Sequence, residues 1–114
     1  MPRVVLVVDD EPDVLEILAA MLEDLGCEVV TAKGPQEALA RLAADPRIDL
    51  LFTDIEMPVM DGYELAEKAK HVRSGLRVIV TSGRAQDRTD LPMVHKPFGT
   101  EALARMMVET TGLR

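Results

Sequence analysis

Acidic residues and one lysine follow three apolar runs of this sequence, where they could bind a metal and a phosphoryl group. Asp9 and Asp10 follow the first run, and Asp54 follows the second. Lys96 follows the third. If the runs are parallel strands, their carboxyl ends meet at one edge of a sheet, where open α/β folds build their sites. Carboxylates crowded there repel one another unless a cation neutralises them, so the spacing predicts a divalent metal site.

The donor set suits Mg²⁺ better than Zn²⁺. Mg²⁺ prefers carboxylate, carbonyl, water and phosphate oxygens, whereas Zn²⁺ favours His and Cys. A carboxylate can also attack phosphorus and give an aspartyl phosphate. That transfer needs the metal, a fixed cation and a hydroxyl or amide donor for the equatorial oxygens. Lys96 would supply the cation, and Ser82 or Thr81 would supply the hydroxyl.

Strands and helices that alternate along the chain must position these residues. Short apolar runs rich in β-branched residues predict strands that are covered on both faces. The predicted strands are 4–8, 27–32, 49–53, 77–81 and 93–95. Apolar residues at helical spacing predict the helices. The predicted helices are 12–25, 35–44, 63–72 and 100–110.

The alternation predicts an α/β doubly wound fold, with a five-stranded parallel sheet and helices on both faces. Pro12 and Gly26 mark the two ends of the first helix. The segment from Gly83 to Pro92 is polar, and it is short for a crossover between parallel strands, which normally takes about a dozen residues or more. The fourth helix is therefore expected to be very short or absent.

Length and composition fit one globular domain, 1–114, without an output domain. The chain has 114 residues, of which 47% are hydrophobic and 3% aromatic, so its core should be aliphatic. A net charge of −7 disfavours nucleic acid and anionic membranes as partners. The single cysteine, Cys27, should be a buried thiol in a reducing compartment. No signal peptide or membrane span is visible, so a cytoplasmic protein is expected.

Four motifs in this order resemble the receiver domain of two-component response regulators, over nearly the whole chain. They are Val7 to Glu11, Thr53 to Gly62, Val80 to Gly83 and Lys96 to Phe98. Each motif is weak alone, but the ordered set is specific. The resemblance implies the flavodoxin-like strand order 2-1-3-4-5 of the chemotaxis receiver.

The resemblance also implies a role for each site residue. Asp54 would be the phosphoacceptor and, with Asp9, Asp10 and the backbone carbonyl of Glu56, would hold Mg²⁺. Lys96 would contact the phosphoryl group.

The hydroxyl that moves on phosphorylation would be that of Ser82 rather than Thr81. Ser82 is preferred because the family follows this hydroxyl with a small residue, here Gly83. Met93 stands at the switch position, where the family has Tyr or Phe. Switching without that ring is expected to change a smaller or different surface, and the short segment before Met93 argues against the usual receiver dimer.

Two further positions in the resemblance tune hydrolysis of the aspartyl phosphate. They are Glu56, two residues after the phosphoacceptor, and Arg84, two residues after the switch hydroxyl. Because one is acidic and the other basic, we expect an ion pair across the mouth of the site that shields the phosphoryl group from water.

The predicted function is that of a phosphoacceptor receiver. A histidine kinase or a histidine phosphotransfer protein would donate a phosphoryl group from phosphohistidine to Asp54, with Mg²⁺ as cofactor. The output would be phosphorylation-dependent binding of a downstream protein, without turnover of an external substrate. Both a stand-alone receiver and a receiver from a hybrid kinase fit this prediction.

Three other functions are compatible with parts of the sequence. A phosphorylation-independent adaptor would explain Met93. An aspartate-nucleophile phosphatase would need a second Asp where Glu56 stands, and a substrate cap for which there is no room. A nucleotide-binding module would need a Gly-rich turn after the first strand, where this chain is acidic.

Overall fold

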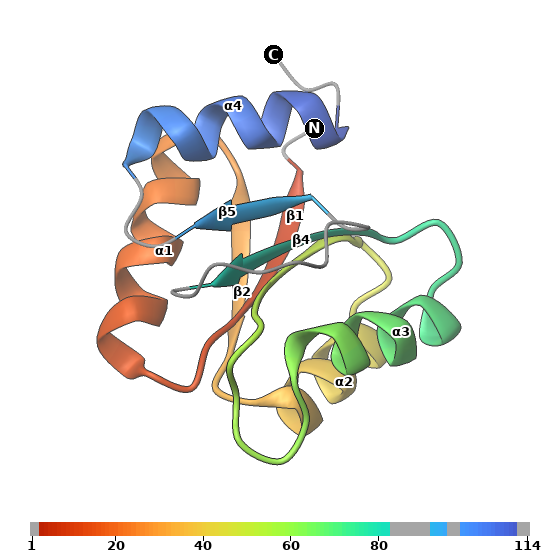
Figure 1. Ribbon diagram of the computed structural model, residues 1–114. Helices are drawn as coiled ribbons and strands as arrows, with labels where there is room; N and C mark the ends of the chain where they lie inside the picture. Colours follow the sequence, from red (N-terminus) through yellow and green to blue (C-terminus); the bar gives the residue numbers. More distant parts are fainter. Residues whose placement is uncertain (1–2, 83–91, 96–98, 112–114) are drawn as a thin grey trace.

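The computed structural model describes residues 3–82, 92–95 and 99–111 (Figure 1). Its elements, in chain order, are β1 (Val4–Val8), α1 (Pro12–Asp24), β2 (Glu28–Ala32), α2 (Pro35–Ala44), β3 (Ile48–Asp54), α3 (Gly62–Val72), β4 (Arg77–Ser82), β5 (Met93–His95) and α4 (Thr100–Thr111). All nine predicted elements are present in the described residues, and each predicted boundary is within one residue of the observed one.

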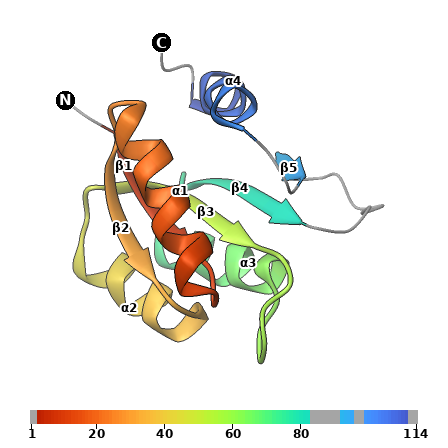
Figure 2. The same ribbon diagram turned by 90° about the vertical axis from the view of Figure 1, so that its left-hand side faces the viewer.

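In the described part of the chain, the strands form one parallel sheet in the order β2-β1-β3-β4-β5. Helices α2 and α3 cover one face, and α1 and α4 cover the other (Figures 1 and 2). This confirms the predicted doubly wound fold and strand order. The predicted very short or absent helix falls on residues 83–91, which lie outside the described residues.

The core consists of two aliphatic clusters, one on each face of the sheet. All five residues of β1 are buried, so their side chains enter both clusters in turn. The cluster beneath α2 and α3 is built around Leu6, Leu42 and Leu51. The cluster beneath α1 and α4 contains Phe52 and, at its margin, methionines of α1 and α4.

Helix α1 ends as its sequence predicts. Gly26 has a φ of +90°, a left-handed conformation that glycine adopts at low cost. Its N–H donates to the carbonyl of Glu23 (3.0 Å), and the N–H of Cys27 donates to that of Leu22 (3.1 Å), which completes a Schellman motif. The thiol of Cys27 is buried, as expected. Burial raises its pKa, an effect to which Asp49 adds and which Arg3 opposes.

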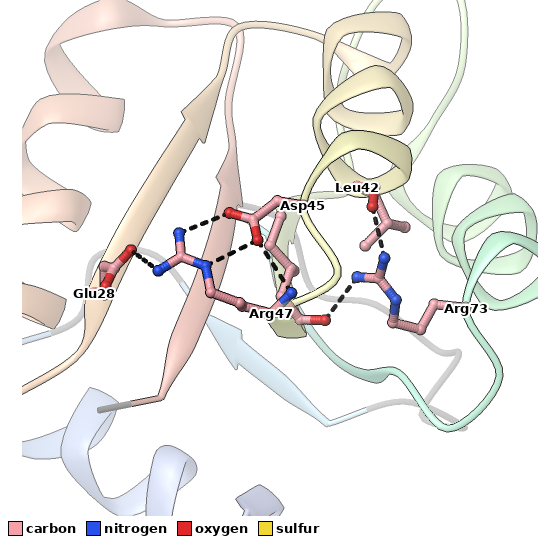
Figure 3. A network of polar contacts seen from close by, with 6 residues as sticks. Glu28, Leu42, Asp45, Arg47 and Arg73 are labelled. Carbon is pink, nitrogen blue, oxygen red and sulfur yellow. Dashed lines mark hydrogen bonds and ion pairs between the residues drawn. The ribbon is translucent and has the colours of Figure 1, made fainter. Parts of the chain in front are cut away.

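An arginine joins three elements at the sheet edge opposite the predicted site. The guanidinium of Arg73, just after α3, donates to the carbonyl oxygens of Ile48 (2.8 Å) and Leu42 (2.7 Å) (Figure 3). These bonds satisfy a carbonyl in the last turn of α2 and fix the start of β3 against the end of α3.

No helix in the described residues is long and apolar enough to cross a membrane.

Candidate functional site

Three carboxylates meet at the carboxyl ends of β1 and β3. Asp9 and Asp10 directly follow β1, and Asp54 is the last residue of β3. Each contributes one carboxylate oxygen to a group whose members lie within 4.8 Å of one another. The side chains of Asp9 and Asp54 are buried, and that of Asp10 is exposed. The fold therefore brings together the three acids that the sequence singled out.

Backbone bonds around these strand ends fix the two buried carboxylates. The ladder pairs Val8 of β1 with Thr53 of β3. The residues that follow them, Asp9 and Asp54, therefore lie side by side at the site. One carboxylate oxygen of Asp9 accepts from the N–H of Glu11 (2.9 Å). Oδ1 of Asp54 accepts from the N–H of Glu56 (3.2 Å). Both side chains are thus oriented by the loop that follows their own strand.

This donor set fits a magnesium ion. Three carboxylates this close repel one another, and burial of two of them strengthens the repulsion because water screens it less. A divalent cation would remove that cost, and hard oxygen donors are the ligands that Mg²⁺ prefers. The arrangement can therefore hold a cation beside the carboxylate of Asp54.

Ser82 and Glu56 meet beside the carboxylates. Ser82 ends β4 and is fully buried, and its hydroxyl donates to Oε1 of Glu56 over 2.7 Å. The neighbouring Thr81 pairs with Asp54 in the sheet ladder. Its Oγ1 is buried and has no hydrogen-bond partner among the described residues. Of the two candidate hydroxyls, in the described residues only that of Ser82 is hydrogen-bonded to a predicted site residue.

Other predicted site residues are placed only in part. Lys96 and Arg84 lie outside the described residues, so the contact of the lysine and the Glu56–Arg84 ion pair stay predictions. Met93 begins β5 beside Val80 of β4. It is partly buried against the cluster beneath α2 and α3, which shows that the switch position borders the core.

The loop from β3 to α3 contains a close contact that the sequence reasoning missed. A Cβ on Gly62 would clash with the carbonyl oxygen of Asp54 and would stand 2.9 Å from Cα of Ile55. The N–H of Gly62 also donates to the carbonyl of Ile55 (2.9 Å). Glycine is therefore required for α3 to pack against the end of β3. From the sequence, Gly62 was identified only as the last residue of the second motif.

Two more features of this loop were not predicted. Asp61 caps α3 by accepting from the N–H of Glu64 (2.9 Å), and the Asp-x-x-Glu spacing of these residues was an available signal. Val59 has a φ of +74° and a side chain that is 95% exposed. Nothing in the sequence indicated this conformation, because β-branched residues rarely adopt it.

A family profile described as "Response regulator receiver domain" matches residues 5–107. The chain belongs to this family. It is thus a receiver domain of a two-component system, with an acidic cluster at the edge of its sheet where a metal ion could bind.

Curated relatives agree with this assignment. A response regulator receiver protein of Anaeromyxobacter sp. is 43% identical over 82 residues, which cover 72% of this receiver and 34% of the relative. The nitrogen assimilation regulatory protein NtrX of Azorhizobium caulinodans is 33% identical over an alignment that covers 100% of this receiver and 28% of NtrX. The chain therefore spans about a third of the length of these relatives.

Solved structures show the same fold. The chemotaxis protein CheY4 of Vibrio cholerae matches with a TM-score of 0.88 and 25% identity, over 96% of this receiver and 99% of CheY4. The response regulator TrrA of Thermotoga maritima, solved in complex with Mg²⁺ and BeF, matches with a TM-score of 0.85 and 31% identity. The match covers 96% of this receiver and 98% of TrrA. The receiver domain of the hybrid histidine kinase CckA matches with a TM-score of 0.81 and 32% identity. The match covers 93% of this receiver and 96% of the CckA domain.

Proposed function

We propose that this receiver accepts a phosphoryl group on Asp54 with Mg²⁺ as cofactor. The donor would be a phosphohistidine of a histidine kinase or of a histidine phosphotransfer protein. The observation that supports this most is the cluster of Asp9, Asp10 and Asp54, in which a strand-end carboxylate faces two others within 4.8 Å. The similarity to TrrA, which was solved with Mg²⁺ and BeF, adds support.

In the proposed transfer, a carboxylate oxygen of Asp54 forms a bond to phosphorus while the bond from phosphorus to the donor imidazole nitrogen breaks. The electron pair of that bond returns to the imidazole. The N–H of Glu56 orients the Asp54 carboxylate through the 3.2 Å bond to Oδ1. Asp9, Asp10, Asp54 and the Glu56 carbonyl would hold Mg²⁺, which when bound neutralises the crowded negative charge.

The proposed output is binding of a downstream protein, not of nucleic acid or a membrane. Phosphorylation adds negative charge at the strand ends, and the Ser82 hydroxyl and the Lys96 amine would turn toward it. The loops that carry these residues would then present a changed surface. Met93, which lies partly buried beside Val80, would repack with them.

A labelling experiment tests the proposal. The protein is mixed with a labelled acyl phosphate, a small phosphodonor, with and without Mg²⁺. Wild type should take up label only with Mg²⁺, and Asp54→Asn should take up none. The exposed Asp13 on α1 offers a matched control, and Asp13→Asn should label like wild type. Undiminished labelling of Asp54→Asn would refute the assignment.

Met93 supports a second candidate, a phosphorylation-independent adaptor, because the ring that usually reports phosphorylation is absent from the switch position. The two candidates differ in how the downstream partner responds. An adaptor would bind its partner with the same affinity in three forms: unmodified wild type, Asp54→Asn, and wild type carrying an acyl-phosphate mimic. A phosphorylation-dependent receiver would bind it more tightly with the mimic.

Turnover of a phosphorylated metabolite would instead favour an aspartate-nucleophile phosphatase. Receiver domains are in general signalling domains rather than enzymes, and Glu56 stands where that phosphatase needs a second Asp.

We also propose that residues 1–114 form one receiver domain, because both core clusters share the same sheet.

A further inference from the structure

The hydroxyl of Ser82 has one proton, and in this structure Glu56 accepts it. The distance from Ser82 Oγ to Glu56 Oε1 is 2.7 Å, which is typical of a hydroxyl that donates to a carboxylate. A hydroxyl can donate one hydrogen bond at a time. While this bond is made, Ser82 cannot donate to any other group.

Glu56 also contacts the phosphoacceptor. Its N–H donates to Oδ1 of Asp54, and its side chain reaches across to the end of the neighbouring strand β4. The backbone of Glu56 therefore touches the group that would be phosphorylated, while its carboxylate holds the hydroxyl that would respond.

We infer that the Glu56–Ser82 hydrogen bond stabilises the unphosphorylated state and must break when Asp54 is phosphorylated. This inference rests on the proposed function, in which the Ser82 hydroxyl donates to the phosphoryl group. The Glu56 carboxylate and the phosphoryl oxygen then compete for the same proton. Glu56 is thus a positioning residue that sets how readily the receiver enters its active state.

The test measures the apparent affinity for beryllofluoride, a mimic of the phosphoryl group, at saturating Mg²⁺. Glu56→Ala removes the competing acceptor and should tighten binding by about three- to tenfold, as expected for loss of one partly exposed hydrogen bond to a charged group. Glu56→Gln keeps an uncharged acceptor and should give a smaller gain. Glu11→Gln removes an exposed acid next to Asp10 and controls for the loss of charge near the site.

The decisive comparison repeats Glu56→Ala in a Ser82→Ala background. Since no hydroxyl proton is then present, the gain should disappear. An equal gain with and without Ser82, or no gain in wild type, would overturn the inference while leaving the proposed function intact. Failure of wild type itself to bind beryllofluoride would overturn the proposed function and this inference together.

Discussion

Val59 is held in a left-handed conformation, with a φ of +74°, in the loop that follows Asp54. For a residue with a Cβ this conformation costs about 1–2 kcal/mol, and Asn tolerates it better. Because the Val59 side chain is 95% exposed, its removal loses little packing. We expect Val59→Asn to raise the free energy of unfolding in urea by about 1 kcal/mol. Val59→Ala lacks the short polar side chain that hydrogen-bonds the local backbone in Asn, so it should gain less. A lower urea midpoint for Val59→Asn than for wild type would refute the strain at this position.

Gly62 allows α3 to pack closely against Asp54, the proposed phosphoacceptor. A methyl group there would clash with the Asp54 carbonyl oxygen, so the loop must shift. We expect Gly62→Ala to lower the free energy of unfolding by about 2 kcal/mol and to slow labelling of Asp54, measured by urea unfolding and by the rate of label uptake. Gly34, where a Cβ would meet nothing within 4 Å, is the matched control. Equal effects of Gly62→Ala and Gly34→Ala would refute the clash.

At the scale of elements, two arginines make different kinds of contact (Figure 3). Both lie near the amino ends of the strands, at the sheet edge opposite the carboxylate cluster. Arg73 donates to backbone carbonyls in α2 and β3. Arg47 instead pairs with the half-buried Asp45 and the exposed Glu28, each over 2.9 Å. Hydrogen bonds from the Arg47 side chain and backbone lower the pKa of Asp45. Water competes for the exposed pairs but less for the carbonyl contacts.

Arg73→Ala should therefore lower the free energy of unfolding by about 2 kcal/mol, because it leaves two partly buried carbonyls without their donor. Arg47→Ala should change it little, since the Arg47 guanidinium is exposed and water and salt screen its ion pairs. Urea denaturation of both variants checks this. Equal losses would show that the carbonyl contacts of Arg73 have no special weight.

All nine elements of the described residues could be predicted because their signals are local. Continuous apolar runs predicted β1 and β3, and Gly26 predicted the end of α1. The carboxylate cluster also followed, since the carboxyl ends of parallel strands share an edge. The Glu56–Ser82 bond and the close approach of Gly62 could not be predicted. They depend on how a loop from one strand meets the next strand, which no local pattern encodes.

At the scale of the molecule, the acidic cluster should make stability depend on Mg²⁺. A ligand at a hundredfold excess over its Kd adds about 2.7 kcal/mol to the free energy of unfolding. Asp9→Asn removes a buried charge from the cluster. It should raise stability without Mg²⁺ by about 1 kcal/mol, because repulsion falls, and it should shrink the gain that Mg²⁺ gives.

Thermal unfolding with and without Mg²⁺ measures both effects. Asp24, an exposed acid at the far end of α1, provides the control, and Asp24→Asn should keep the full response to Mg²⁺. A Mg²⁺ response of Asp9→Asn as large as that of wild type would argue against the cluster as the metal site.

We propose above that Asp54 becomes phosphorylated in a Mg²⁺-dependent reaction. Mass spectrometry of peptides from the acyl-phosphate-treated protein tests it most directly. We expect one phosphoryl group per molecule, on Asp54, and only when Mg²⁺ is present. A phosphoryl group on another residue, or equal modification without Mg²⁺, would contradict it.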